Sequence, residues 1–219
     1  MPALSSTKTV ALFGGAMHVD VPASYIDVSP LREVPDHQEV YADAAATDAC
    51  LIVELLTTPL DQEDSPSLIP PVTSPAAYHF GQLAVDADAL SATLRREAPL
   101  PSADMPAMVA SVAAATRRRI GTPAPSVEAS VATGTHAVAK FREAADAANT
   151  VEVTVACFRL PHVTTDLLVI VNDPLVIAPG SSSAATGARA GGGGGEGAFE
   201  NAVRTLRVDD WSLFRDDDV

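Results

Sequence analysis

Acidic side chains gather just before the first long apolar segment of the chain. The stretch REVPDHQEVY (residues 32–41) places Glu33, Asp36 and Glu39 around a Pro-Asp turn, and Asp27 precedes it. Such a group of carboxylates is typical of a solvated loop. It is also the composition expected of a surface that attracts a positively charged partner.

One further carboxylate lies inside an apolar segment. In CLIVELL (residues 50–56) strand alternation puts Ile52, Glu54 and Leu56 on one sheet face. Burying a lone carboxylate is costly, so Glu54 needs a partner or a position near the surface. Two interpretations stay open: an acid among exposed aliphatic side chains that binds a partner, and an internal salt bridge to an arginine.

Other kinds of chemistry are poorly supported. No phosphate-binding GxxxxGK[ST] loop occurs. Gly192, Gly194 and Gly197 satisfy GxGxxG, but they lie in a Ser/Ala/Gly tract without the preceding strand that such a loop needs. No GxSxG occurs either, and a hydrolase that uses His79 or His162 with a nearby aspartate is the least favoured alternative. We expect no enzymatic activity and no cofactor.

The two cysteines indicate neither a disulfide framework nor a metal site. Cys50 and Cys157 lie in apolar, strand-like segments, and neither has a Cys or His at zinc-ligand spacing. We therefore expect two free, buried thiols and no bound metal.

Charge is distributed regionally. The 219 residues carry a net charge of −14, and residues 27–64 alone hold ten acids and one base, which gives −9. This balance disfavours nucleic acid or an anionic membrane as the main partner. No apolar run reaches the roughly 18 residues of a spanning helix, and no secretory signal is apparent, which predicts a cytosolic or nuclear protein.

The elements that would position these residues follow from periodicity and from turn residues. We predict loops over 24–37 and 57–75, helices over 76–97, 107–119 and 198–206, and strands over 7–15, 16–22, 38–43, 50–56, 126–133, 136–143, 150–161 and 165–175. The strands at 38–43 and 50–56 should form a hairpin, and TGT (133–135) should be a turn. Short connections favour a mostly antiparallel sheet of about six strands in an α/β (α+β) fold. A single domain of residues 1–178 and 198–219 is expected, with a flexible Ser/Ala/Gly-rich insert at 179–197.

The order of several segments resembles the Ran guanine-nucleotide release factor family, the Mog-type nuclear transport proteins. These segments are LFGGA, YIDVSPLREVPDHQEVY, LIVELL, VAKF, FRLPHVTTDLLVIVNDP and WSLF. The resemblance covers most of residues 8–57 and 136–175 and the end near 208–214. It implies a curved antiparallel sheet with helices on both faces, a Mog/PsbP-like fold.

The resemblance also implies a function: binding the small GTPase Ran and promoting release of its nucleotide in nuclear transport, in nucleus and cytoplasm. It leaves a Ran-binding co-regulator open as a further partner. The family's acidic patch carries over most directly onto Glu54, and its frequent second acid three residues later is Thr57 here. The other carried-over positions are Asp27, Glu33, Asp36, Gln38 and Glu39. The alternative is a PsbP-like structural or assembly subunit with no GTPase partner.

Overall fold

The computed structural model describes residues 6–44, 47–59, 68–69, 72–118, 126–139, 143–185, 187–188, 190 and 194–214. Its strands are β1 Thr7–Leu12, β2 Met17–Pro22, β3 Tyr25–Asp27, β4 Gln38–Asp43, β5 Cys50–Thr57, β6 Ser91–Pro99, β7 Glu128–Val138, β8 Asn149–Leu160, β9 Thr165–Val176 and β10 Arg207–Val208. The helices are α1 Pro75–Asp86, α2 Pro106–Arg118, α3 Ser182–Ala185 and α4 Gly194–Thr205.

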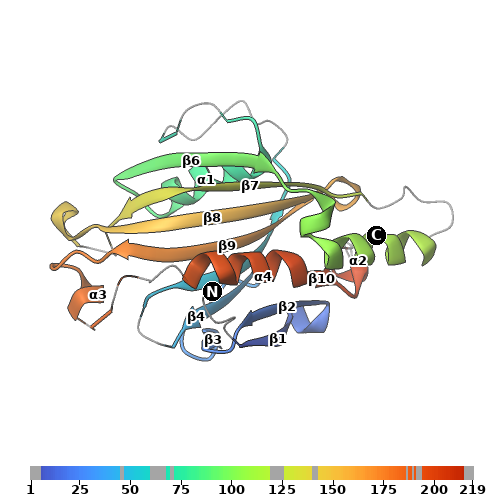
Figure 1. Cartoon of the computed structure of the whole chain (residues 1–219), viewed down its shortest axis with the longest axis horizontal. Coiled ribbons are helices and arrows are strands. Elements are labelled where there is room, and N and C mark those ends of the chain that lie inside the picture. The colour runs from blue at the N-terminus through green and yellow to red at the C-terminus, as the bar shows by residue number, and fades with distance from the viewer. Residues whose placement is uncertain are drawn as a thin grey trace.

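Two antiparallel sheets organise the described chain. Seven strands form the larger sheet in the order β3-β4-β5-β9-β8-β7-β6, and β1, β2 and β10 form a smaller one. Figure 1 shows the larger sheet as a twisted surface with α4 on one face and α1 on the other. The predicted architecture, a mostly antiparallel sheet with helices on both faces, is confirmed; the sheet has seven strands rather than about six.

Each face of the larger sheet has its own apolar core. On one face α1 packs Ala77 and Phe80 against Val155 and Ile170. On the other face α4, α2 and the smaller sheet bury a larger cluster, which includes Met17, Val169, Phe199 and Leu206. The strand residues alternate between these two cores, so neighbouring side chains on one strand serve different faces.

Several predicted elements are confirmed. β4 and β5 form the predicted hairpin, with Gln38 paired to Glu54. β1 and β2 are joined through Gly14 and Gly15, whose φ angles of 65° and 94° suit glycine. Ser74 caps α1 by accepting a hydrogen bond from the Ala77 backbone N–H, and Pro75 follows at the first helical position.

Two predictions about the middle of the chain are wrong. The helix predicted over 76–97 ends at Asp86, and residues 91–99 form the edge strand β6 instead. Ala92 and Leu94 pack on the α1 core from this strand, so their apolar character fitted either structure.

The two strands predicted over 126–133 and 136–143 are one strand, β7. Gly134 is not a turn residue: an added Cβ there would lie 2.2 Å from the Thr93 carbonyl oxygen and 2.6 Å from the Phe80 ring. The glycine provides room for Phe80 against the sheet.

Residues 179–197, predicted as a flexible insert, lie partly outside the described residues; the described part includes α3 and the first turn of α4. The helices of the described chain lack the combination of length and apolar character needed to cross a bilayer.

Candidate partner-binding site

The β4–β5 hairpin fixes Glu54 at the α1 side of the larger sheet. Glu54 is only 6% exposed, and its Oε1 accepts a hydrogen bond from Gln38 Nε2 at 2.7 Å. His37 Nε2 lies 3.4 Å from the same oxygen. Within the described residues Glu54 has no arginine partner, so the internal Arg–Glu salt bridge is not the arrangement found. The carboxylate is held in place by a neutral amide and a half-exposed imidazole.

Glu39 points to the opposite face of the sheet. Its Oε1 accepts a hydrogen bond from the Phe13 backbone N–H at 2.6 Å, which ties β4 to the end of β1. Asp27 is paired with Tyr41 across β3 and β4. Burial raises the pKa of Tyr41 to about 12, and the nearby carboxylates of Glu39 and Asp27 add to the shift.

The remaining predicted residues are exposed. Glu33 and Asp36 lie on the loop between β3 and β4, and Thr57 ends β5 opposite Thr165. Asp27 stabilises the start of this loop, because its carboxylate accepts hydrogen bonds from the Ser29 N–H at 2.8 Å and the Ser29 hydroxyl at 2.9 Å. The seven predicted residues therefore gather at one end of the sheet but do not share one face.

His37 is the last residue of the loop predicted over 24–37. It lies beside Glu54 because the loop backbone returns there: the Leu55 N–H donates to the His37 carbonyl oxygen at 2.9 Å. The available signal was the hairpin register, since Gln38 opposite Glu54 places residue 37 next to it as well. Leu31, 72% exposed in the same loop, was also not singled out.

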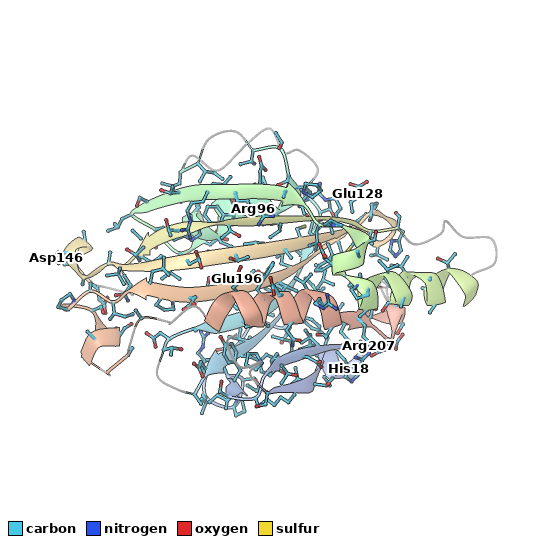
Figure 2. All side chains as sticks on the ribbon, viewed as in Figure 1. His18, Arg96, Glu128, Asp146, Glu196 and Arg207 are labelled. Carbon is cyan, nitrogen blue, oxygen red and sulfur yellow. The ribbon has the colours of Figure 1, made fainter. Side chains whose placement is uncertain are left out.

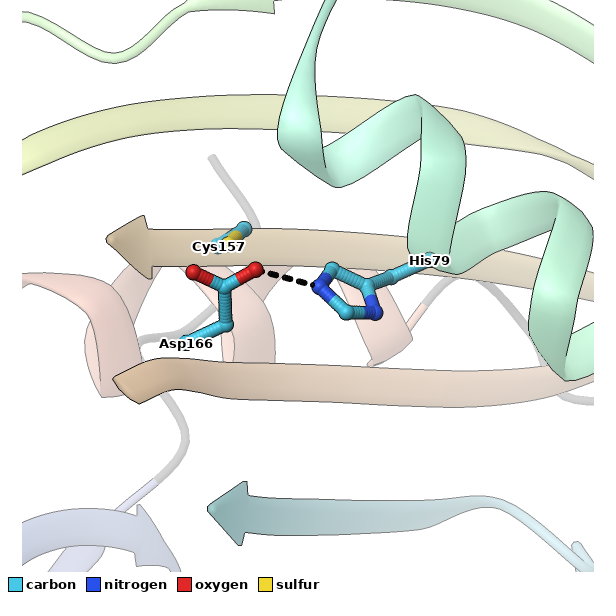
Figure 3. Close-up of side chains that lie close together, drawn as sticks. All are labelled: His79, Cys157 and Asp166. Atoms are coloured by element: carbon cyan, nitrogen blue, oxygen red, sulfur yellow. Dashed lines mark hydrogen bonds and ion pairs between the residues drawn. The ribbon is translucent and has the colours of Figure 1, made fainter. Parts of the chain in front are cut away.

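A second group of side chains that could bind a metal or act in catalysis lies between α1 and the larger sheet. His79 from α1, Cys157 from β8 and Asp166 from β9 offer ligand atoms within 4.8 Å of one another, and Figure 3 shows His79 bonded to Asp166 beside Cys157. The His79 Nε2–Asp166 Oδ2 distance is 2.7 Å. Arg159 donates to both oxygens of Asp166 at 2.8 and 2.7 Å. α1 is far in sequence from the consecutive strands β8 and β9, so no spacing motif revealed the cluster.

The electrostatics of the cluster favour a structural role. Burial would raise the pKa of Asp166, but hydrogen bonds from Arg159 and His79 outweigh it and hold the pKa far below its usual range. Burial, with Asp166 nearby, raises the pKa of the Cys157 thiol well above its ordinary value. A protonated thiol is a poor nucleophile, and Arg159 already neutralises the carboxylate. His79, 3% exposed, and Asp166, 0% exposed, offer a hydrolase substrate no access.

The family model described as Ran-interacting Mog1 protein matches residues 10–174. A Ran guanine nucleotide release factor from Danio rerio is 33% identical over 206 residues, which cover 93% of this chain and 97% of the relative. A nuclear import protein mog1 from Schizosaccharomyces pombe is 30% identical over 198 residues, 90% of this chain and 92% of the relative.

The fold has a solved counterpart. The crystal structure of the Ran-binding protein Mog1p from Saccharomyces cerevisiae superposes with a TM-score of 0.58 at 25% identity. The superposition covers 96% of this chain and all of the solved one. The likeness therefore extends over both sheets and is not confined to the acidic segment.

Proposed function

The chain belongs to the family of Ran-interacting Mog1 proteins, and we propose that it binds Ran through the surface around Glu54 and thereby promotes release of the guanine nucleotide. It is a Ran guanine-nucleotide release factor, a regulatory binding protein rather than an enzyme, that acts in nuclear transport. These relatives favour this function over a PsbP-like assembly subunit.

The assignment to Glu54 rests on one observation. Neighbouring side chains hold its carboxylate in place, but no arginine of the described chain pairs with it. Gln38 and His37 both contact Oε1. A cationic side chain of Ran would complete the pairing, and a charge-assisted hydrogen bond to a preorganised carboxylate is stronger than one between neutral groups.

The other acidic residues divide by role. Glu33 and Asp36, exposed on the loop beside His37, are placed to attract the basic partner and to raise its association rate. Glu39 and Asp27 are engaged inside the chain, with Phe13 and Ser29, and shape the loop rather than contact Ran. Gln38 orients Glu54, and Thr57 borders the surface without adding charge.

Nucleotide release follows from differential binding. A GTPase holds its nucleotide with a phosphate-cradling loop, a lysine and a magnesium ion. A partner shifts that equilibrium only if it binds the nucleotide-free state more tightly than the loaded state. Glu54 provides the difference if it pairs with a basic group of Ran that the departing phosphates leave free.

The test replaces Glu54 by lysine and by glutamine. Loss of a hydrogen-bonded charge pair costs about 2 kcal/mol or more, so we expect binding to nucleotide-free Ran to weaken about thirtyfold or more for Glu54→Lys. Pull-downs with GTP-bound, GDP-bound and nucleotide-free Ran, together with release of a fluorescent GTP analogue, measure both steps. Glu54→Gln keeps the shape and should show a smaller loss.

A matched control is Asp146→Lys, a charge reversal at the exposed turn before β8, which Figure 2 shows at one end of the sheet. Glu54 lies nearer the opposite end, level with Leu168 and Cys157. Asp146→Lys should leave binding and release unchanged. If Glu54→Lys changes neither binding nor release, the assignment of this residue is wrong. Association should also slow as salt rises, because the segment 27–64 carries a net charge of −9. We further propose that the protein works in both nucleus and cytoplasm.

A further inference from the structure

A cleft of about 570 Å³ lies on the opposite face of the sheet from Glu54. In Figure 1, α4 covers β9 and leaves the same face of β7 and β8 open. The floor is formed by side chains of these strands, among them Thr133 and Thr154, and the walls by β6 and α4. The volume falls within the range of pockets that bind ligands.

The β6 wall carries two adjacent arginines because the strand is irregular. The register with β7 shifts between Leu94 and Arg96, and such a bulge re-aims side chains that would otherwise alternate. Arg95 and Arg96 both line the cleft. Arg95 is paired with Glu152 on the floor. Figure 2 shows Arg96 on the opposite side of β8 from Glu196 of α4.

The α4 wall and the adjoining floor are acidic. Glu196 and Glu200, one turn apart, face the cleft from α4. At the same end lies Asp173, which is 3% exposed. Its Oδ2 accepts a hydrogen bond from the Gly195 N–H at 3.1 Å, whereas its buried Oδ1 has no partner among the described residues. A buried acceptor without a donor is costly and points to a missing one.

We propose that this cleft binds an extended protein segment through a lysine or arginine side chain whose cationic group donates to Asp173 Oδ1. Glu196 provides the second negative charge at that end, since Arg95 already neutralises Glu152. The aliphatic part of the side chain packs on Val171, and Arg96 is free within the described chain to donate to a backbone carbonyl of the segment. This site is separate from Glu54 and does not depend on Ran binding.

The raised pKa of Asp173 is the shift expected of a buried carboxyl that has no cation beside it. Burial raises the pKa of Asp173, and the carboxylates of Glu152 and Asp43 add to the shift. A bound cation would favour the ionised form, so binding should lower the pKa of this carboxyl. That change gives a readout independent of affinity.

The experiment titrates the full-length protein with a blocked pentapeptide that has a central lysine between two valines. A second peptide carries norleucine in place of lysine. Amide chemical shifts should move for Thr133, Thr154 and Gly195 with the lysine peptide and stay unchanged with the norleucine peptide. The side-chain carboxyl carbon of Asp173, followed against pH, should report a lower pKa in the presence of the lysine peptide.

Two variants distinguish binding of the lysine peptide at this site from nonspecific attraction of a cationic peptide to an acidic protein. Asp173→Asn keeps an oxygen for the Gly195 N–H and should weaken the lysine peptide at least tenfold. Glu196→Gln, on the exposed wall, should weaken it about threefold even if the first variant folds poorly. Asp146→Asn should have no effect.

Absence of saturable binding, equal binding of the norleucine peptide, or shifts confined to residues 27–57 would each overturn the proposal. None of these outcomes bears on Ran binding, which the Glu54 variants test separately.

Discussion

Replacing Asp166 should be among the most destabilising single substitutions in this chain. The carboxylate is 0% exposed and receives hydrogen bonds from Arg159, His79 and the Thr58 hydroxyl, the last at 3.1 Å. Asp166→Leu removes the carboxylate to which two guanidinium nitrogens of Arg159 donate, and the Arg159 side chain is only 16% exposed. Removing one partner of a buried ion pair costs about 3–5 kcal/mol, and we expect a loss of unfolding free energy in that range.

Urea denaturation followed by far-UV circular dichroism measures this loss, with the slope of the transition checked for two-state behaviour. Asp166→Leu combined with Arg159→Met removes both charges, and most of the stability should return because an apolar pair of similar volume replaces the ion pair. The control is Arg95→Met, which breaks the half-exposed pair with Glu152 and should cost about 1 kcal/mol or less.

A loss below about 1 kcal/mol for Asp166→Leu would refute the view that the network stabilises the sheet. A double variant no more stable than the single one would refute the view that loss of the Asp166–Arg159 charge pair is the cause. The pH dependence adds a third check. Because the folded pKa of Asp166 is lowered, its contribution is fully present above the unfolded pKa near 3.8 and is lost as pH falls below it.

Three further predictions concern stability. Burial lowers the pKa of His136 to about 4, although a hydrogen bond with the Phe80 backbone opposes the shift. As pH falls from 6.5, His136 therefore takes up a proton in the unfolded chain before it does so in the folded chain. Unfolding free energy should decrease by up to about 3 kcal/mol between pH 6.5 and 4, and His136→Gln should remove that slope in urea titrations at each pH. Gly134→Ala should cost about 1–3 kcal/mol, because the new Cβ meets the Thr93 backbone; an unchanged melting curve would contradict this reason. Ser74→Ala removes the α1 cap and should cost about 1 kcal/mol. Ser102→Ala, at an exposed residue of a short helix whose start has no side-chain cap hydrogen bond within the described residues, should be neutral in the same assay.

Sequence reasoning correctly predicted those parts of the fold in which one local signal dominates. The hairpin of β4 and β5 was predictable because two strand-like runs flank a short polar tip. Glu54 was identified as exceptional because a carboxylate on a strand face needs an explanation. The helix predicted over 76–97 failed because Leu94 is apolar at a spacing that suits both a helix and a strand, and pairing with β7 decided between them.

The site was harder to predict than the fold. Strand alternation alone indicates that Gln38 and Glu39 point apart, but the partner of each depends on segments distant in sequence: Phe13 for Glu39, and the returning loop with His37 for Glu54. The buried cluster around Asp166 combines residues from α1, β8 and β9 and leaves no local pattern. Tertiary contacts of this kind follow from topology rather than from spacing.

The smaller sheet unites the two ends of the described chain. β10 pairs with β2 through Arg207–His18 and Val208–Met17, and the Asp209 N–H donates to the Ala16 carbonyl oxygen at 2.9 Å. During biosynthesis the β1–β2 ribbon therefore emerges from the ribosome long before its third strand exists. Contacts of such large sequence separation form slowly, so Met17 and Val19 stay without their final cover until β10 has been synthesised. A nascent chain of this protein should need protection by chaperones until that point.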